Sequence, residues 1–361
     1  MFDSFNKIRK LDWPLMIAVF FIILCSFLSL SSTALNKFRQ QFIFCLIGIL
    51  IFFLVLKINW RPLTNYWSLI MGFYFFVIFL LLITLFFAPS IRGIKGWLKI
   101  GNFLFQPSEL AKISLILLFA KFFSRKHISI ARVANLFSSF VYFAIPAALI
   151  ALQPDFGTVL VLFFIWLGFL LVSGIRWRHL VIALIIFLIF GIFSWNKILK
   201  NYQKERILGF LFPERDPFGI NYSTIQAKIA IGSAGFFGKG FKQGTQTQLG
   251  FLPEAQTDFI LAAFIEEWGI LLGILLIVSF FIMISRIIKI GLETDNNFDR
   301  LFCLGIAILF LIQFIFNAGS NLGLVPVIGV TFPFLSYGGS SLLTNFILIA
   351  MVESIVAFRV F

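Results

Sequence analysis

Acidic side chains are scarce in this chain, and most of them lie where a charge is costly. Of the 15 Asp and Glu residues, five fall in a polar N-terminal tail and one polar loop: Asp3, Asp12, Glu293, Asp295 and Asp299. Ten remain within or beside long apolar segments: Glu109, Asp155, Glu205, Glu214, Asp216, Glu254, Asp258, Glu266, Glu267 and Glu353. An ionisable group inside or at the edge of a membrane bundle is expensive, so each of these ten is a candidate for a functional position.

The segment 106–112, QPSELAK, places an acid and a base on one helical face. Pro107 suits the first helical position, which puts Glu109 in the first turn and Lys112 three residues further along the same face. The two charges can pair near the outer membrane surface. Two interpretations stand: the pair belongs to a polar site, or Glu109 complements the helix dipole and Lys112 neutralises it without any ligand.

Two outer turns carry further candidates. Asp155 lies in 153–158, QPDFGT, where it is either a site residue or simply a turn or N-cap residue. Trp97 lies in the basic turn 92–99, RGIKGWLK, where it is either an interfacial belt residue or a specific contact.

Two carboxylates and a threonine converge in 250–260, GFLPEAQTDFI, at the entrance of a long apolar segment. Thr257 or Asp258 could cap a helix there, or Asp258 could face a site. Glu266 and Glu267 lie two to three turns deeper. A like-charged pair at that depth raises at least one pKa unless Lys or Arg approaches it.

The elements that must position these residues are membrane helices. The chain has 361 residues, of which 60% are hydrophobic and 12% charged, and this excludes a soluble globular protein. Apolar runs of this length, without alternating polarity, exclude a transmembrane barrel as well. We expect an all-α bundle of about ten transmembrane helices, at about 13–30, 41–56, 67–88, 108–123, 134–152, 158–174, 179–195, 259–285, 301–318 and 341–357.

Basic residues set the expected orientation. With the N-terminus inside, 15 Lys and Arg residues lie on the cytoplasmic side and five in the short outer loops, so we expect both termini inside. The net charge of +14 therefore reflects topology and does not indicate nucleic acid. Residues 1–361 read as a single domain, with a long, partly helical outer loop at about 196–258 between the seventh and eighth helices. The segment 319–340 is broken by proline and glycine, so it cannot be one straight helix.

The ordered motifs resemble one family over nearly the whole chain. They are GWL at 96–98, QPSELAK at 106–112, QPDFGT at 153–158, PERDP at 213–217, IQAKIAIGS at 225–233, FLPEAQTDFI at 251–260 and PFLSYGGSS at 333–341. Together they are similar to the SEDS proteins of bacterial shape, elongation, division and sporulation. The stretch 239–249, KGFKQGTQTQL, and the short N-terminus resemble the RodA branch. Gln256 departs from the family pattern, which usually has His there.

The resemblance implies a peptidoglycan glycosyltransferase in the bacterial cytoplasmic membrane. Its substrate would be lipid II, an undecaprenyl-pyrophosphate-linked disaccharide pentapeptide, polymerised at the outer face during cell elongation and shape maintenance. Asp258 matches the family's essential acid and is the candidate base. The matching substrate-binding positions are Trp97, Glu109, Lys112 and Asp155, and Lys112, Lys228, Lys239 and Lys242 are candidate cations for the pyrophosphate.

The resemblance also implies a class B penicillin-binding transpeptidase as partner, with other membrane proteins of the elongation complex. It further implies that divalent cations support activity. A Mg²⁺ between carboxylate and pyrophosphate is compatible with this, although no complete metal cage is visible and the metal ligands are unknown. Two alternatives stay open: a lipid II flippase or other transporter, since acids and lysines in a bundle also describe a translocation path, and a non-catalytic scaffold of the synthesis complex.

Overall fold

The computed structural model describes residues 11–58, 66–91, 93–101, 103–125, 133–174, 201–212, 219 and 221–358, and isolated residues between 181 and 197. Seven helices in these ranges are long and apolar enough to cross a membrane: α2 (Trp13–Thr33), α3 (Leu35–Leu56), α5 (Trp67–Phe87), α7 (Val133–Leu152), α13 (Ile260–Leu292), α14 (Asn297–Leu322) and α15 (Gly339–Ala357). α6 (Pro107–Arg125), which carries buried charges, and α8 (Phe156–Val172), which is shorter, pack among them. The chain is thus an all-α membrane bundle, as predicted.

Nine of the ten predicted spans correspond to these helices. The tenth, 179–195, lies largely outside the described residues, and the PERDP motif at 213–217 lies entirely outside them. A small addition was not expected: β1 (Leu98–Ile100) pairs antiparallel with β2 (Phe103–Phe105) in the turn that precedes α6.

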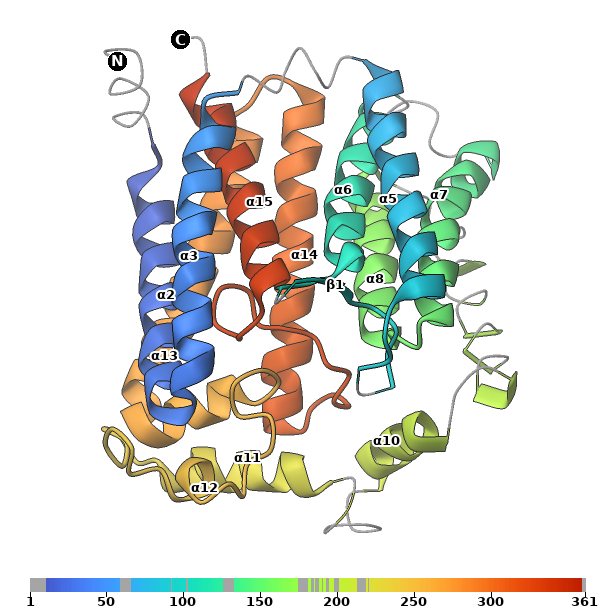
Figure 1. Ribbon diagram of the computed structural model, residues 1–361. Coiled ribbons are helices and arrows are strands. Elements are labelled where there is room, and N and C mark those ends of the chain that lie inside the picture. Colours follow the sequence, from blue (N-terminus) through green and yellow to red (C-terminus); the bar gives the residue numbers. More distant parts are fainter. Residues whose placement is uncertain are drawn as a thin grey trace.

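The bundle has two distinct ends (Figure 1). At the end called the terminal end, α2 begins and α15 stops. Across the opposite end, called the loop end, lie α10 (Asn201–Leu211), α11 (Tyr222–Ser233) and the one-turn α12 (Thr245–Gln248). These short helices agree with the partly helical loop predicted at 196–258.

α13 is too long to be a single straight span. Its 33 residues would extend about 50 Å, whereas the hydrocarbon core is about 30 Å thick. Gly269, with φ 86° and ψ 166°, divides the helix into a short piece at the loop end and a long membrane piece. A positive φ of this kind is accessible to glycine at little cost.

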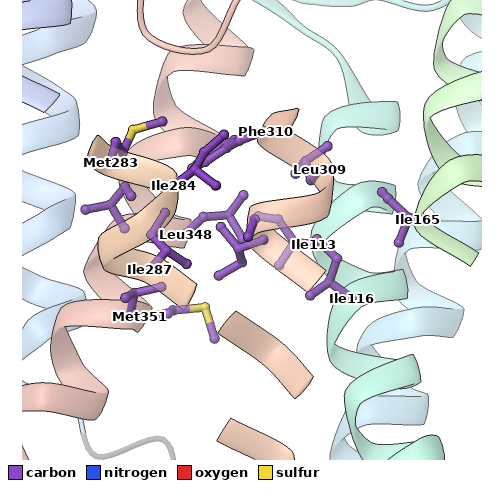
Figure 2. Close-up of a cluster of buried hydrophobic side chains, with 14 of the residues drawn as sticks. Ile113, Ile116, Ile165, Met283, Ile284, Ile287, Leu309, Phe310, Leu348 and Met351 are labelled. Atoms are coloured by element: carbon purple, nitrogen blue, oxygen red, sulfur yellow. The ribbon is translucent and has the colours of Figure 1, made fainter. Parts of the chain in front are cut away.

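Apolar side chains fill the centre of the bundle. Figure 2 shows side chains from α6, α8, α13, α14 and α15 meeting in one cluster, and the labelled members include Ile113, Ile165, Ile284, Phe310 and Leu348. Because these residues are buried and come from five helices, they hold the helices that surround the site in a fixed arrangement.

The first helices pack against the last. α2 contacts α13, and α3 contacts α15. At the terminal end, the Asp12 carboxylate caps α2 by accepting a hydrogen bond from Leu15 N. The same carboxylate accepts a hydrogen bond from Arg286 Nε at 3.0 Å, and the Asp12 N–H donates to the Glu353 carboxylate at 3.0 Å. These contacts tie together the start of α2, the later part of α13 and the end of α15.

The segment between α14 and α15 is irregular, as expected from its prolines and glycines. Gly323 ends α14 in the left-handed conformation, with φ 69°. Phe332, Phe334 and Leu335 are nevertheless fully buried. Irregular backbone is tolerated at such depth where it is enclosed by protein, and this segment reaches the start of α13.

Candidate functional site

Glu109 and Lys112 form a buried ion pair in the first turn of α6. Lys112 Nζ donates to Glu109 Oε1 at 2.7 Å, and both side chains are less than a tenth exposed. Glu109 Oε2 is buried without a hydrogen-bond partner. A buried carboxylate oxygen left without a donor is costly in a finished structure, so this arrangement leaves an acceptor available for a water or a ligand.

Asp155 is the N-cap of α8 and lies near the same pair. Its carboxylate accepts from Thr158 N at 3.1 Å and Thr158 Oγ1 at 2.8 Å, so the capping role expected from the turn is confirmed. Gln106 Nε2 donates to Asp155 Oδ2 at 3.3 Å, which links the cap to the start of α6. Burial raises the pKa of Asp155, while the bonds from Thr158 and the charge of Lys112 oppose that rise.

The hairpin completes this corner of the molecule. Trp97 is half-buried just before β1, and Lys95 N donates to Gln153 O at 3.3 Å. At the other end of the hairpin, Gln106 N donates to Ser340 Oγ at 3.1 Å. The starts of α6, α8 and α15 are therefore joined by hydrogen bonds at one place. This place, defined by Glu109, Lys112 and Asp155, is called the inner cluster below.

Asp258 lies elsewhere, in the turn that leads into α13, and its side chain is partly exposed. The N-cap of α13 is Phe259, and Thr257 Oγ1 bonds back to Glu254 Oε2 at 3.1 Å. The interpretation that Thr257 or Asp258 is the cap residue is therefore wrong, because the cap lies one residue after Asp258 and two residues after Thr257.

The backbone around Asp258 is held from two distant segments. Asn321 Nδ2 donates to Asp258 O at 2.8 Å, and the same amide accepts from Ala262 N at 3.0 Å through its oxygen. Ser336 Oγ donates to Thr257 O at 2.7 Å. These contacts bring the end of α14 and the 323–338 segment onto the Asp258 turn.

Gln256, the departure from the family pattern, has a defined partner. Its side-chain oxygen accepts from Lys37 Nζ of α3 at 2.9 Å, and its carbonyl oxygen accepts from Tyr337 N at 2.9 Å. Sequence reasoning missed Lys37, Asn321 and Ser336. Among them only Ser336 lies in a quoted motif, and all three make their contacts with residues far away in the chain.

The three loop lysines have different surroundings. Lys228 is exposed on α11 and reaches over Gly323, where a Cβ would lie 2.5 Å from its Nζ. Lys239 Nζ donates to Glu266 Oε1 at 3.0 Å. Lys242 is exposed, and its Nζ lies 5.5 Å from the centre of the Phe241 ring. The structure thus ties Lys228 and Lys239 to the ends of α14 and α13, and it leaves their predicted pyrophosphate roles untested.

Within the part of the chain that the structure describes, no group of three or more His, Cys, Asp or Glu side chains could hold a metal ion. In the inner cluster, the unpartnered Glu109 Oε2 belongs to a carboxylate that already pairs with Lys112. The lysine ammonium would repel a divalent cation there, so the inner cluster does not fit a metal and we derive no step through one. A Mg²⁺ between another carboxylate and the pyrophosphate stays a prediction.

Comparison with known proteins decides the family. The model of the FtsW, RodA and SpoVE family, described as cell cycle proteins, matches residues 9–360. The chain belongs to this family. It is 39% identical over 258 residues to the peptidoglycan glycosyltransferase MrdB of Escherichia coli K12, covering 71% of this chain and 69% of that protein. It is 35% identical over 347 residues to MrdB of Helicobacter pylori J99, covering 94% and 88%.

Comparison with solved structures supports the same family. A chain from a study of how a peptidoglycan synthase complex coordinates polymerization and crosslinking matches with a TM-score of 0.82 and 30% identity, covering 97% of this chain and 99% of that one. The rod shape determining protein RodA of Thermus thermophilus matches with a TM-score of 0.72 and 28% identity, covering 96% of each chain. The family member described here is accordingly a RodA-type peptidoglycan glycosyltransferase of cell elongation and an integral membrane protein, as predicted.

Proposed function

We propose that this enzyme polymerises lipid II at the loop end of the bundle, and that Asp258 is the catalytic base. The observation that carries the proposal is the fixed Asp258 turn, which Asn321 and Ser336 hold at 2.8 Å and 2.7 Å where the loop meets α13. A carboxylate on a fixed backbone, partly exposed beside the outer loop, is suited to meeting a sugar carried on a membrane lipid.

The reaction is a glycosyl transfer with a pyrophosphate leaving group. Asp258 accepts the proton of the acceptor hydroxyl as its oxygen forms a bond to the anomeric carbon of the donor sugar. The bond from that carbon to the lipid pyrophosphate breaks, and the electron pair leaves with the pyrophosphate oxygen. Positive charge is required there, and the cations predicted for it from the sequence are Lys112, Lys228, Lys239 and Lys242.

The inner cluster is proposed as the polar site that receives the headgroup, with Trp97 beside its hairpin. Support comes from the open acceptor at Glu109 Oε2 and from the single hydrogen-bonded corner that joins Glu109, Lys112 and Asp155. These roles rest on the chemistry of the side chains and on the family resemblance.

We propose that the loop end faces outward and that both termini lie in the cytoplasm. The test is Lys242→Cys in a variant whose three cysteines are replaced, since Lys242 is exposed at the loop end and Cys25, Cys45 and Cys303 are buried. An impermeant thiol reagent should label intact cells. Labelling only after permeabilisation would reverse both the orientation and the substrate side.

The proposed partner is a class B penicillin-binding transpeptidase, with other membrane proteins of the elongation complex around it. The support is the similar structure described as part of a synthase complex that coordinates polymerization with crosslinking.

The deciding experiment incubates the purified chain, alone and with that transpeptidase, with lipid II. Glycan polymer resolved by length on a gel is expected. Movement of lipid II across vesicles without polymer would favour the flippase, which the buried Glu109 and Lys112 charges also suit. Neither polymer nor movement in either mixture would favour a scaffold.

A further inference from the structure

The buried carboxylate of Glu266 accepts hydrogen bonds from two parts of the preceding loop, at residue 239 and at residues 245–247. Its side chain is completely buried and accepts from Lys239 Nζ at 3.0 Å, Gln246 N at 2.8 Å and Thr247 N at 3.0 Å. The hydroxyls of Thr245 and Thr247 donate to it as well. Five donors on one carboxylate is a saturated site, so it has no capacity left for a ligand. Its function must lie in what it holds.

The same loop fills the break in α13. At the Gly269 kink the helical hydrogen-bond ladder is interrupted, and the loop supplies the missing partners. Lys239 N donates to Glu266 O at 2.9 Å and Gly240 N to Glu267 O at 3.0 Å, while Ile270 N donates to Gly235 O at 3.0 Å. The loop therefore satisfies backbone groups that the kink leaves unpaired, and the kink exposes the groups to which the loop bonds.

Two glycines are required by this close approach. A Cβ on Gly238 would lie 2.2 Å from Glu267 O, and a Cβ on Gly244 would lie 2.8 Å from Glu266 Oε2. Gly244 has φ −65° and ψ 111°, which any residue can adopt, so a side chain is excluded there by contact with the Glu266 carboxylate and with Glu267 Cγ, 3.1 Å from the Cβ position.

The contact chain continues from Glu266 to the Asp258 turn. Gln246, whose N–H bonds Glu266, accepts from Leu252 N at 2.9 Å through its carbonyl. Leu252 is buried in one small cluster with Ala255 and Phe259, which flank Asp258. Residues 239–252 are called the clip below.

We propose that Glu266 is a positioning residue for Asp258, acting through the clip, and that Lys239 serves as its counter-ion and does not bind pyrophosphate. The inference rests on the proposed function, because it takes Asp258 to be the base. It assigns a role to Glu266, one of the two adjacent acids deeper in the entrance segment, and it gives Lys239, one of the predicted substrate cations, a different role.

The first test measures lipid II polymerisation by Glu266→Gln. The substitution replaces one carboxylate oxygen, a hydrogen-bond acceptor, with an amide nitrogen, a donor. Because the clip presents only donors to this side chain, its hydrogen bonds to residue 266 weaken and the clip loosens. A misplacement of about 1 Å lowers kcat by about tenfold to a hundredfold, with KM changed by less than about twofold. Gly244→Ala, which wedges a methyl against the same carboxylate, should lower kcat in the same way. The matched control is Glu293→Gln, at the C-cap of the same helix and in a half-exposed pair with Lys289, and it should match wild type.

The second test is a double-mutant cycle with Lys239→Met. If Lys239 acts only through Glu266, the double variant is no slower than Glu266→Gln alone. If Lys239 binds pyrophosphate, Lys239→Met raises KM and the two effects multiply, which would overturn the inference. Hydrogen exchange at 251–259 should accelerate in both clip variants while their melting transitions remain cooperative.

Asp258→Asn, measured in parallel, separates the two proposals. If Asp258→Asn is inactive while Glu266→Gln and Gly244→Ala polymerise lipid II at the wild-type rate, only the positioning role is overturned. A fully active Asp258→Asn would overturn the base, and with it the claim that Glu266 acts through that base.

Discussion

The inner cluster and the Asp258 turn are built in opposite ways. In the inner cluster, Lys112 pairs with Glu109 three residues away, and Asp155 caps α8 by accepting from Thr158 N three residues away. At the Asp258 turn, the bonds come from Asn321 and Ser336, which lie 63 and 79 residues from their acceptors. The charged side chains of the inner cluster have their strongest partners close in sequence, whereas the backbone of the Asp258 turn is held by side chains from remote segments. Charge changes should damage the first, and loss of remote supports should damage the second.

The largest effect is expected for Asp258→Asn. The amide keeps the size of the side chain but cannot accept the proton, so polymerisation should fall by about a hundredfold to ten-thousandfold. Expression, thermal stability and partner binding should be unchanged, because no helix cap is lost. A wild-type rate measured with lipid II would transfer the base assignment to Glu109 or Asp155.

Lys112→Ala should come next, and it should affect stability as well as activity. Removing the ammonium leaves Glu109 as an uncompensated buried charge, which costs about 3–5 kcal/mol in comparable sites. Polymer formation should be lost while the protein still inserts. The exchange variant Glu109→Lys, Lys112→Glu is the discriminating measurement, since recovery of activity would mean that the pair is only structural.

Asn321→Ala removes both bonds that this amide makes to the entrance of α13. The stranded Ala262 N–H and Asp258 carbonyl cost about 1–3 kcal/mol each if they stay dry, and the freed turn should slow kcat by about tenfold. Thermal unfolding and polymerisation assays check the two effects separately. A variant that is destabilised but has a normal kcat would show that Asp258 does not need this support.

The smallest effect is expected for Asp155→Asn, and it is a change in how the melting temperature depends on pH. Burial raises the pKa of Asp155 in the folded state, so its protonation stabilises the wild type below the ordinary carboxyl pKa of about 3.9. That contribution is lost as the pH rises through the folded-state pKa. The melting temperature of wild type relative to Asp155→Asn, which caps the helix equally well, should therefore fall with rising pH. A difference that is flat with pH would mean that burial does not perturb this carboxyl.

The local features could be predicted because their partners are close in sequence. Helix periodicity placed Glu109 beside Lys112, and turn chemistry identified Asp155 as a cap. The positions of Asn321 and Lys37 could not be predicted, since nothing within a few residues of either indicates its contact. The role of Glu266 was hidden for the same reason, because its donors lie 19 to 27 residues earlier and the loop takes shape only around the Gly269 kink.

Because the first helices pair with the last, their polar side chains must wait during synthesis until their partners have been made. Ser32 in α2 bonds Glu267, 235 residues later, and Asp12 bonds Glu353, 341 residues later. At about 5–20 residues per second, a ribosome needs tens of seconds to supply those partners. During that interval α2 and α3 lie in the lipid with polar side chains such as Gln41 unmatched. Nascent chains of this enzyme should therefore stay vulnerable to membrane quality-control proteases until the 336–338 segment and α15 emerge, because these supply the partners of Gln41 and Asp12.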